Sequence, residues 1–486
     1  MKPDKIKRVL LVNPFKYGAG IRNIGVDPVV SRHSGQEIKT GVTFPIGLAY
    51  MAAMLLKNGY DVRILDPIAE KMPVSRIHDS TGWSDAVIMP FSVSHMEDIK
   101  TFRRNFRDKL LVLGGGYSKF VPDKLLAEDY CDVILNGEPE KTIVELMDRY
   151  PDIGGVQGII YRIDGLTKTT PERPLIQNLD ELPFPERRLL NPKLYWDISY
   201  YGLPTTWVLP ARGCPFDCIF CAQFDRNTKS VRYRSAKNIV DEMESVVNDS
   251  GVRNFAFFDE TFNVNDKQVK AVCNEMLARK LRVKWWCAAR ADLIKEDIAL
   301  LMKKAGCIEM RVGLESANDE VLRYMKKDIT VEEIRKGLRI LKKIGLNFSL
   351  QCIFGSPMEN RATIMNTMRF IKEAGPLFVS FNVLTPLPGS QLFEEIKDNI
   401  DINALKNFDI LHTNFPLGRY SGEELSKIIK RAYFSYYTSP GYLLRISKEA
   451  FKRPRLIYFI IKTLIVQGFY VYKSIFRYKS RGVGTA

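Results

Sequence analysis

Three cysteines on one short stretch have the residue type and spacing that could do chemistry in this chain. Cys214, Cys218 and Cys221 follow one another in a C-x₃-C-x₂-C pattern. Three thiolates on one loop suit a 4Fe–4S cluster and leave one iron without a protein ligand. The alternatives are a zinc knuckle that lacks its fourth ligand, or three unrelated cysteines. Zinc is disfavoured because the chain has only 4 histidines and none is near this stretch.

The cysteines directly follow an apolar, β-favouring run at residues 205–209. This order predicts a loop at the C-terminal end of a strand, where α/β folds collect their functional groups. Gly213 allows a tight turn into the loop. Five more strands are expected at residues 254–259, 283–290, 309–316, 349–354 and 378–384. Helical patterns separate them, so the sequence predicts a partial (β/α)₆ barrel.

A second α/β pattern occupies the first part of the chain. Strands are expected at residues 9–12, 61–65, 86–91, 110–113 and 133–135, with helical segments between them. This alternation predicts a parallel, doubly wound, Rossmann-like sheet. Small residues follow the last three strands, and such loops form a ligand crevice at one sheet edge. The candidate ligand contacts there are Ser92, Ser94, Gly114, Gly115, Gly116, Gly137 and Glu138.

The cysteine loop, with aromatic Phe220 before its third cysteine, resembles the signature of radical S-adenosylmethionine (radical SAM) enzymes. In that family the open iron is chelated by S-adenosylmethionine, whose reductive cleavage releases a 5′-deoxyadenosyl radical. Residues 7–149 resemble, in order and spacing, the cobalamin-binding domain that precedes the barrel in one radical SAM class. The resemblance therefore implies three cofactors, namely a 4Fe–4S cluster, S-adenosylmethionine and cobalamin.

The resemblance also assigns cofactor contacts, and the chain departs from the family pattern in two places. S-adenosylmethionine would be contacted by Phe220, Gly313, Glu315, Ser316, Gly355 and Pro357. Met358 and Asn360 stand where the family has Gly and Thr. The Asp-x-His-x-x-Gly motif, whose histidine ligates cobalt in other cobalamin proteins, is absent. His95 comes closest but lacks the flanking Asp and Gly, so we interpret it as a structural or surface histidine.

Asp259 and Arg290 lie at the ends of neighbouring predicted strands and allow two interpretations. An Asp and an Arg so placed can form a structural ion pair. Alternatively, Asp259 faces the substrate or the corrin ring, and Arg290 binds a ligand carboxylate. In the second interpretation they are the candidate catalytic residues.

The length of 486 residues predicts several domains. We place a cobalamin-binding domain at residues 1–150 and a Pro-rich linker at 151–195. The radical SAM barrel follows at 196–400, and a helical, basic and apolar region at 401–486. The five cysteines outside the loop are scattered in apolar surroundings and imply no disulfide framework, and the first residues lack a signal-peptide core. A cytoplasmic location is expected.

The net charge of +16 is unevenly distributed, because residues 441–486 contain ten Lys and Arg but one acid, Glu449. The apolar, aromatic run at 456–472 is at the short limit for spanning a bilayer. Two interpretations stay open: a basic amphipathic segment peripheral to the inner face of the membrane, or a helix packed over the barrel mouth. The aromatics form no stacking groove, so no nucleic acid partner is expected.

The family most similar in these features is that of cobalamin-dependent radical SAM enzymes, including anaerobic magnesium-protoporphyrin IX monomethyl ester cyclases and hopanoid methylases. The resemblance implies C-methylation of an unactivated carbon on a hydrophobic, lipid or tetrapyrrole-like substrate. It also implies a low-potential electron donor such as ferredoxin or flavodoxin. The alternatives are a non-methylating radical oxidation, cyclisation or C–C coupling, or a non-catalytic electron-transfer or sensing protein.

Overall fold

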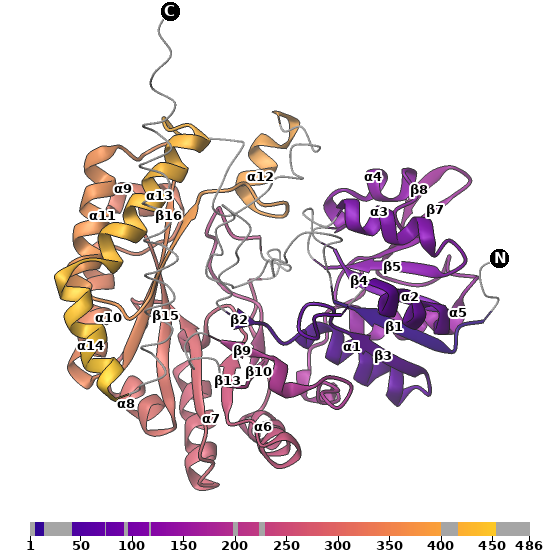
Figure 1. Ribbon diagram of the computed structural model, residues 1–486, viewed down its shortest axis with the longest axis horizontal. Coiled ribbons are helices and arrows are strands. Elements are labelled where there is room, and N and C mark those ends of the chain that lie inside the picture. Colours follow the sequence, from indigo (N-terminus) through magenta and orange to yellow (C-terminus); the bar gives the residue numbers. More distant parts are fainter. Residues whose placement is uncertain are drawn as a thin grey trace, which may run out of the picture.

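The computed structural model describes residues 5–13, 41–72, 74–91, 96–115, 118–197, 203–222, 229–399 and 417–452. Ser92, Ser94, His95 and Gly116, together with the tail beyond residue 452, lie outside the described residues. Two sheets of mainly parallel strands form the framework, one for each predicted α/β pattern (Figure 1).

The first sheet has seven strands, and its strand order reverses near its start. The order is β3 (Asp61–Leu65), β1 (Arg8–Val12), β4 (Ala86–Pro90), β5 (Leu110–Gly114), β6 (Val133–Leu135), β7 (Ile159–Ile163) and β8 (Leu166–Thr169). The strands from β3 to β6 are parallel, whereas β7 and β8 pair antiparallel. Because β1 lies between β3 and β4, the switch point of the sheet is beside β1.

Helices cover both faces of this sheet, which confirms the doubly wound prediction. Alternate strand residues point to opposite cores: Val9 and Leu11 pack with Leu146, whereas Leu10 packs with Ile99. The first face is covered by α1 (Ile46–Lys57) and α5 (Pro139–Arg149). The second is covered by α2 (Val74–Trp83), α3 (Met96–Asn105) and α4 (Pro122–Ala127).

The stretch predicted as a linker is partly built into the first sheet. β7 and β8 fall within residues 151–195, and β7 pairs with β6 through Tyr161 and Val133. The exact domain boundaries stay a prediction.

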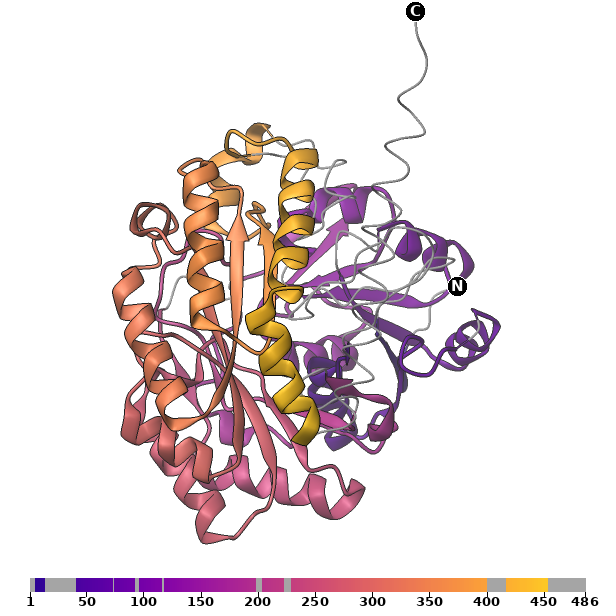
Figure 2. The ribbon, with the colours of Figure 1, turned by 60° about the vertical axis from the view of Figure 1, so that its left-hand side comes forward.

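The second sheet has six parallel strands in chain order and curls into a half-barrel (Figures 1 and 2). They are β10 (Thr205–Val208), β13 (Asn254–Phe257), β14 (Lys284–Ala289), β15 (Cys307–Glu315), β16 (Asn347–Phe354) and β17 (Val379–Val383). The main covering helices are α6 (Ala236–Ser250), α7 (Asp266–Ala278), α8 (Glu296–Lys304), α10 (Val331–Ile344) and α11 (Arg361–Ala374). The shorter helices α9 (Asp319–Tyr324) and α12 (Gln391–Ile396) follow β15 and β17. The partial (β/α)₆ barrel is confirmed.

Alternation along the barrel strands separates a helix-covered face from a concave face. Trp285 packs on the helix side, stacked on Phe257 at 4.6 Å between ring centroids. Its neighbour Trp286 is on the opposite face, where the Arg311 guanidinium lies 3.5 Å from its ring centroid. Arg311 also donates to Asp197 at 2.7 Å, so the concave face is closed here by a segment from before the barrel.

The exposed edge of the half-barrel is protected by α13 (Gly422–Tyr437), which runs beside β17, and α14 (Pro440–Lys452) follows it (Figure 2). The Tyr437 hydroxyl accepts from Val379 N at 3.0 Å and donates to Val379 O at 3.1 Å. The Tyr433 hydroxyl accepts from Phe381 N at 3.0 Å. These hydroxyls take the place of a neighbouring strand. Among the helices of the described residues, none is long and apolar enough to cross a membrane.

Candidate active site

The cysteine loop is a closed hairpin at the C-terminal end of β10. Its base is a short antiparallel ladder between β11 (Ala211–Arg212) and β12 (Arg232–Tyr233). Gly213 turns the chain into the loop with a φ of 97°, and a Cβ there would lie 2.1 Å from Ser230 O. Only glycine fits this turn.

The three loop cysteines carry thiols in partly enclosed positions. Cys214 is buried, whereas Cys218 and Cys221 are half-buried. Burial raises the pKa of Cys218, and the nearby Lys327 ammonium opposes that rise. Nowhere in the described residues, these cysteines included, do three His, Cys, Asp or Glu side chains already converge as a formed metal site. Three thiols on one loop remain the donor set that suits a 4Fe–4S cluster.

The far side of the loop is anchored on the barrel. Ile219 N donates to Met325 O at 3.1 Å, and Leu392 N donates to Ile219 O at 3.0 Å. Ile219 packs in a small apolar cluster with Met325 and Leu392, and Phe220 lies against it. The loop is therefore held by backbone bonds to the segments that follow β15 and β17.

Arg290 braces the same loop. The Phe216 ring centroid lies 3.7 Å from its guanidinium carbon. The guanidinium also donates to Asp292 at 3.1 Å and to Lys327 O at 2.9 Å. The predicted ion pair with Asp259 is therefore wrong: Asp292, two residues away, is the partner. Contact of Arg290 with a ligand carboxylate stays a prediction.

Asp259 lies in the loop after β13 and is half-buried. Its Oδ1 is buried and has no hydrogen-bond partner within the described structure. Burial raises the pKa of Asp259 well above its usual range, and the neighbouring Glu260 carboxylate adds to the rise. A buried oxygen without a donor is costly unless a ligand or water supplies one. The position therefore fits a group that donates hydrogen bonds.

A buried ion pair occupies the end of β15. Glu315 accepts from Lys327 Nζ at 2.7 Å, and each side chain is only 7% exposed. A Cβ on Gly313 would lie 2.4 Å from the Glu315 carboxylate and 2.7 Å from Lys327 Nζ. Gly313 thus makes room for both charges. Ser316 is buried close to Thr367, with 3.4 Å between the hydroxyl oxygens.

Sequence analysis did not single out Lys327. The residue follows another lysine in the turn before α10, and no local pattern distinguishes the two. In the structure Lys326 is exposed and bonds Gln391, whereas Lys327 is 6% exposed and points to Glu315. A buried lysine between the cysteine loop and Glu315 is suited to bind an anionic ligand group.

The loop after β16 is held together by Glu359. Its Oε2 accepts from Ser356 N at 3.1 Å and from Gly355 N, while Gly355 adopts a φ of 103°. Burial raises the pKa of Glu359 to about 7, although these two amides oppose the rise. Pro357 is half-buried in the same turn. The carboxyl therefore shapes the loop from inside and does not face solvent.

In the first domain, the described loops at the carboxyl ends of β5 and β6 have the expected backbone freedom. Gly115 and Gly137 have φ values of 97° and 109°. Nothing lies within 4 Å of a Cβ built on Gly137, whereas one on Gly114 would touch Leu135 at 3.3 Å. Asn136 Oδ1 is buried without a hydrogen-bond partner. This edge has room and an unused acceptor, so it fits a bound ligand.

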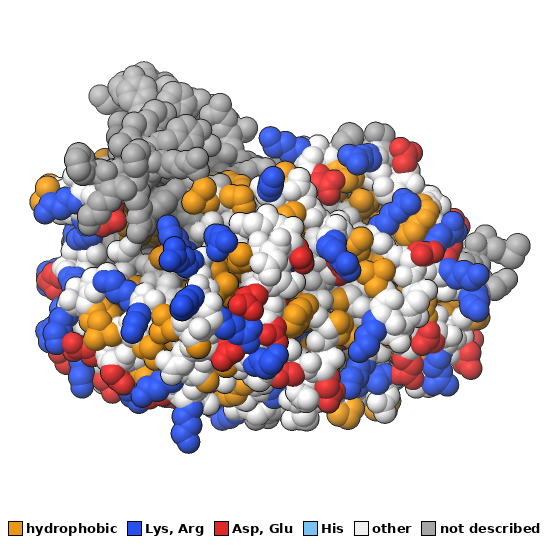
Figure 3. Space-filling model, turned by 90° about the horizontal axis from the view of Figure 1, so that it is seen from below, with side chains coloured by type: hydrophobic (Ala, Val, Ile, Leu, Met, Phe, Trp, Pro, Cys, Tyr) orange, Lys and Arg blue, Asp and Glu red, His pale blue; other side chains and the backbone are white. Residues whose placement is uncertain are grey.

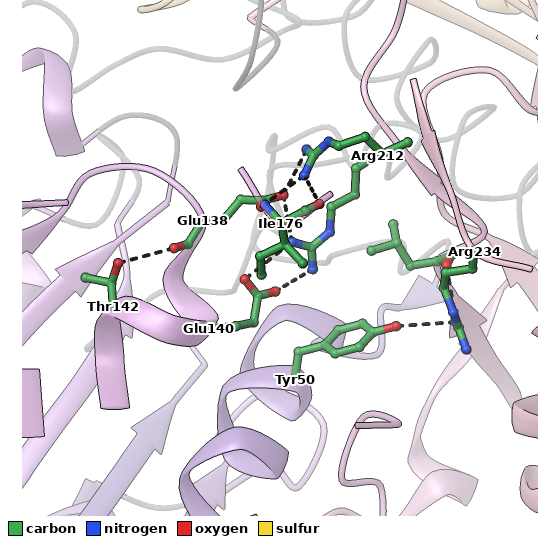
Figure 4. A network of polar contacts seen from close by, with 9 residues as sticks. Tyr50, Glu138, Glu140, Thr142, Ile176, Arg212 and Arg234 are labelled. Carbon is green, nitrogen blue, oxygen red and sulfur yellow. Dashed lines mark hydrogen bonds and ion pairs between the residues drawn. The ribbon is translucent and has the colours of Figure 1, made fainter. Parts of the chain in front are cut away.

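Glu138 has a role that was not expected. Its carboxylate accepts from Arg212 at 2.8 Å, from Arg232 at 2.9 Å and from Ile176 N at 2.8 Å (Figure 4). Both arginines belong to the base of the cysteine loop. The predicted contact of Glu138 with cobalamin stays a prediction, but the side chain joins the two domains.

Comparison with known proteins agrees with this geometry. The Radical SAM superfamily profile matches residues 208–371, which run from β10 into α11. The chain is also 30% identical over 453 residues to the "Uncharacterized methyltransferase PH0819" of Pyrococcus horikoshii, covering 91% of this chain and 95% of the relative. The chain belongs to the radical SAM superfamily. The family predicted from the sequence is thereby confirmed.

Other similar radical SAM proteins carry more specific names. The chain is 28% identical to the anaerobic magnesium-protoporphyrin IX monomethyl ester cyclase of Rubrivivax gelatinosus, over 90% of this chain and 81% of that protein. It is 25% identical to the hopanoid C-3 methylase of Methylococcus capsulatus, over 78% and 74%.

A solved structure shares the fold of this radical SAM protein across both domains. The methyltransferase TsrM from Kitasatospora setae, with cobalamin and a [4Fe-4S] cluster bound, matches with a TM-score of 0.64. The match has 20% sequence identity and covers 81% of this chain and 78% of that chain. The match therefore supports the two-domain architecture. The role of each residue is inferred from the geometry of the site.

Proposed function

We propose that this radical SAM protein is a cobalamin-dependent methyltransferase that acts on an unactivated carbon of a hydrophobic, lipid or tetrapyrrole-like substrate. The observation that carries the proposal is the cysteine loop, which lies at the barrel mouth and is joined to the first domain by Glu138. When bound, the 4Fe–4S cluster and S-adenosylmethionine supply a 5′-deoxyadenosyl radical, and cobalamin supplies the methyl group.

The residues around the loop support binding of these groups. Cys214, Cys218 and Cys221 would ligate the cluster. The Lys327 ammonium would bind the carboxylate of S-adenosylmethionine, and Asp259 Oδ1, which lacks a donor, would accept from its amino group. Because the Lys327 side chain and Asp259 Oδ1 are buried, they would orient the ligand before the reaction and exclude water from it.

Cobalamin would occupy the carboxyl edge of the first sheet. The open backbone at Gly137 and the positive φ of Gly115 let a large ring approach the main chain. Asn136 Oδ1 would accept from an amide of the ring periphery. The remaining predicted contacts are Ser92, Ser94, Gly114 and Gly116; of these four, Gly114 alone lies within the described residues.

The names of the similar proteins also support a second type of reaction, in which no methyl group is transferred. The similar proteins include both cyclases and methylases, so a non-methylating oxidation, cyclisation or coupling of the substrate would use the same site. Either reaction needs a low-potential electron donor, for which ferredoxin or flavodoxin is proposed. A purely electron-transferring or sensing protein is the remaining alternative.

One anaerobic experiment separates these functions. The protein is reconstituted with iron, sulfide and hydroxocobalamin, then incubated with reductant and S-adenosylmethionine. The proposal expects bound corrinoid and both 5′-deoxyadenosine and S-adenosylhomocysteine. If 5′-deoxyadenosine forms without S-adenosylhomocysteine, the methyltransferase proposal fails in favour of the non-methylating reaction. If a cluster is present but neither product forms with any tetrapyrrole or lipid substrate, an electron carrier is favoured.

A peripheral membrane contact through residues 441–486 is part of the proposal for lipid-like substrates. Leu444, which lies within this segment, is 61% exposed, and Phe434 on α13, which precedes the segment, is 44% exposed. By contrast, the face shown in Figure 3 mixes Lys and Arg with Asp and Glu and has no large region of one charge. Sedimentation with anionic vesicles, with and without residues 441–486, tests the contact; equal sedimentation would contradict it.

A further inference from the structure

Two carboxylates of the first domain face two arginines at the base of the cysteine loop (Figure 4). Arg212 donates to Glu138 at 2.8 Å and to Glu140. Arg232 donates to Glu138 at 2.9 Å and to Ile176 O at 2.7 Å. Glu138 precedes α5 and Glu140 lies in its first turn. The four side chains form a single ionic cluster between the domains.

The two arginines define the base of the loop. Arg212 and Arg232 are register partners in the β11–β12 ladder, and all three predicted cluster ligands lie between them in sequence. Arg212 is separated from Cys214 only by Gly213, where the backbone of Ser230 leaves no room for a side chain. Because a single residue separates Arg212 from Cys214, a displacement of Arg212 would be transmitted to the first cysteine.

The ionic cluster is balanced in charge, and three of its members are buried while Arg212 is half-buried. Glu138 is 8% exposed, Glu140 3% and Arg232 7%. Hydrogen bonds and charge from the two arginines lower the pKa of Glu138 despite its burial. Removing one member of such a cluster leaves an uncompensated charge in a poorly solvated place, which is far more costly than breaking a surface pair. The cluster is therefore a specific connection and not an incidental surface contact.

A second contact ties the other side of the loop to the first domain. Leu392 of α12 donates its backbone N–H to Ile219 O at 3.0 Å, and the adjacent Phe393 packs in the core of the first domain. A Cβ on Gly389, just before α12, would lie 2.7 Å from the Phe120 ring of the first domain. The cysteine loop is thus fixed against the first domain at two separate points.

We propose that Glu138 and Glu140 are positioning residues for the iron–sulfur cluster, acting through Arg212 and Arg232. The inference rests on the proposed function, because it requires a cluster on Cys214, Cys218 and Cys221. In this arrangement the first domain fixes the position of the iron–sulfur cluster, and it also binds a ligand at the edge of its own sheet. The ionic cluster also determines the net charge beside the cysteine loop.

The test compares Arg212→Met and Glu138→Gln with wild type after anaerobic reconstitution with iron and sulfide. The matched control is Arg103→Met, because Arg103 is also buried and paired, with Asp132 at 2.8 Å, but lies within the first domain. Iron content, the rate of iron loss to a chelator, the reduction midpoint of the cluster and hydrogen exchange of residues 211–222 are measured, and thermal unfolding gauges general stability.

The proposal expects at least tenfold faster iron loss and faster exchange of the loop amides in both test variants. The two variants should shift the midpoint in opposite directions. Arg212→Met leaves an excess negative charge and lowers the midpoint, whereas Glu138→Gln leaves an excess positive charge and raises it. Arg103→Met should keep the wild-type values even if it unfolds at a lower temperature.

Iron-loss rates within twofold of wild type and unchanged midpoints in both test variants would overturn the inference. If Arg212→Met does not fold, Glu138→Gln decides alone, since it keeps the side-chain volume and one acceptor oxygen. A wild-type protein that binds no cluster would instead refute the proposed function. The two failures are therefore distinguishable.

Discussion

At the scale of single residues, the site depends on a glycine that leaves room for the side chains of its neighbours. Gly313 leaves space that the Glu315 carboxylate and the Lys327 ammonium fill together. Glu315 itself adopts a φ of 56°, which is unusual for a residue with a side chain. The backbone is thus strained at the point where an anionic ligand group would meet the lysine, as often occurs at functional sites.

Replacing Lys327 with methionine is expected to lower the free energy of unfolding by about 3 kcal/mol, because it leaves the Glu315 carboxylate buried without its partner. Lys326→Met is the matched control and should change stability by no more than about 0.5 kcal/mol, since Lys326 is exposed. Denaturant unfolding measures both. Adding Glu315→Gln to Lys327→Met should restore part of the loss; no difference between the two lysine variants would contradict the assignment.

Glu359 predicts a pH dependence with a definite sign. Its pKa in the folded protein is about 7 against 4.5 for an ordinary Glu. Between these values the folded state binds more protons than the unfolded state, so stability falls as the pH rises from about 5 to 7. The free energy of unfolding of Glu359→Gln should therefore be close to that of wild type at pH 5. At pH 8 it should exceed that of wild type by on the order of 3 kcal/mol.

The exposed Glu320 on α9 offers the control, because Glu320→Gln should leave the melting temperature unchanged at both pH values. Parallel wild-type and Glu359→Gln curves across this pH range would show that the Glu359 carboxyl is ionised in the folded protein and contradict the prediction.

Some residue roles could not be predicted from local patterns. Cys214, Cys218 and Cys221 were recognisable because their spacing is itself the signal. Lys327 was not, because its burial is decided by a carboxylate 12 positions earlier, across the turn after β15. The expected pairing of Asp259 with Arg290 failed because Asp292 offers a partner on the same loop.

At the scale of elements, the edge strand β17 shows how the half-barrel ends without an exposed ladder. Its outward backbone groups at Val379 and Phe381 bond tyrosine hydroxyls of α13. Tyr437→Phe should cost about 1–2 kcal/mol, because it leaves a backbone donor and acceptor of Val379 unpaired. Hydrogen exchange of the Val379 amide should accelerate.

Tyr433→Phe provides a reciprocal control, since it should expose the Phe381 amide and leave Val379 protected. If both variants accelerate exchange equally along the whole strand, the hydroxyls act only through general packing and the specific pairing is refuted.

The parallel strands of both sheets were predictable from apolar runs bounded by turn residues, and their observed ends differ by only a few residues. For β16 the expected start at 349 became Asn347. β7 was missed because Ile159 and Ile160 are followed at once by Tyr, Arg and Ile, a short mixed run whose strand character depends on pairing with β6. Local propensity cannot report such a partner.

At the scale of the whole molecule, the ionic cluster between the domains makes their docking sensitive to acid. The pKa of Glu138 is lowered, so its stabilising contribution is complete above the ordinary Glu pKa and is lost as the pH falls through its folded-state value. The radius of gyration of the wild-type protein, measured by small-angle scattering, should therefore increase only below about pH 4.5. Glu138→Gln should be looser at pH 7 and change less on acidification; identical pH profiles would argue that Glu138 does not control docking.

The double attachment of the cysteine loop has a consequence for biogenesis. Ile219 is tied through α12 and Arg212 through the start of α5, so the far side and the base of the loop reach their final positions only after the first domain has folded against the barrel. Iron and sulfur delivered to a nascent chain would meet thiols that are not yet arranged. We therefore expect maturation to follow an order in which polypeptide docking comes first and metal insertion last.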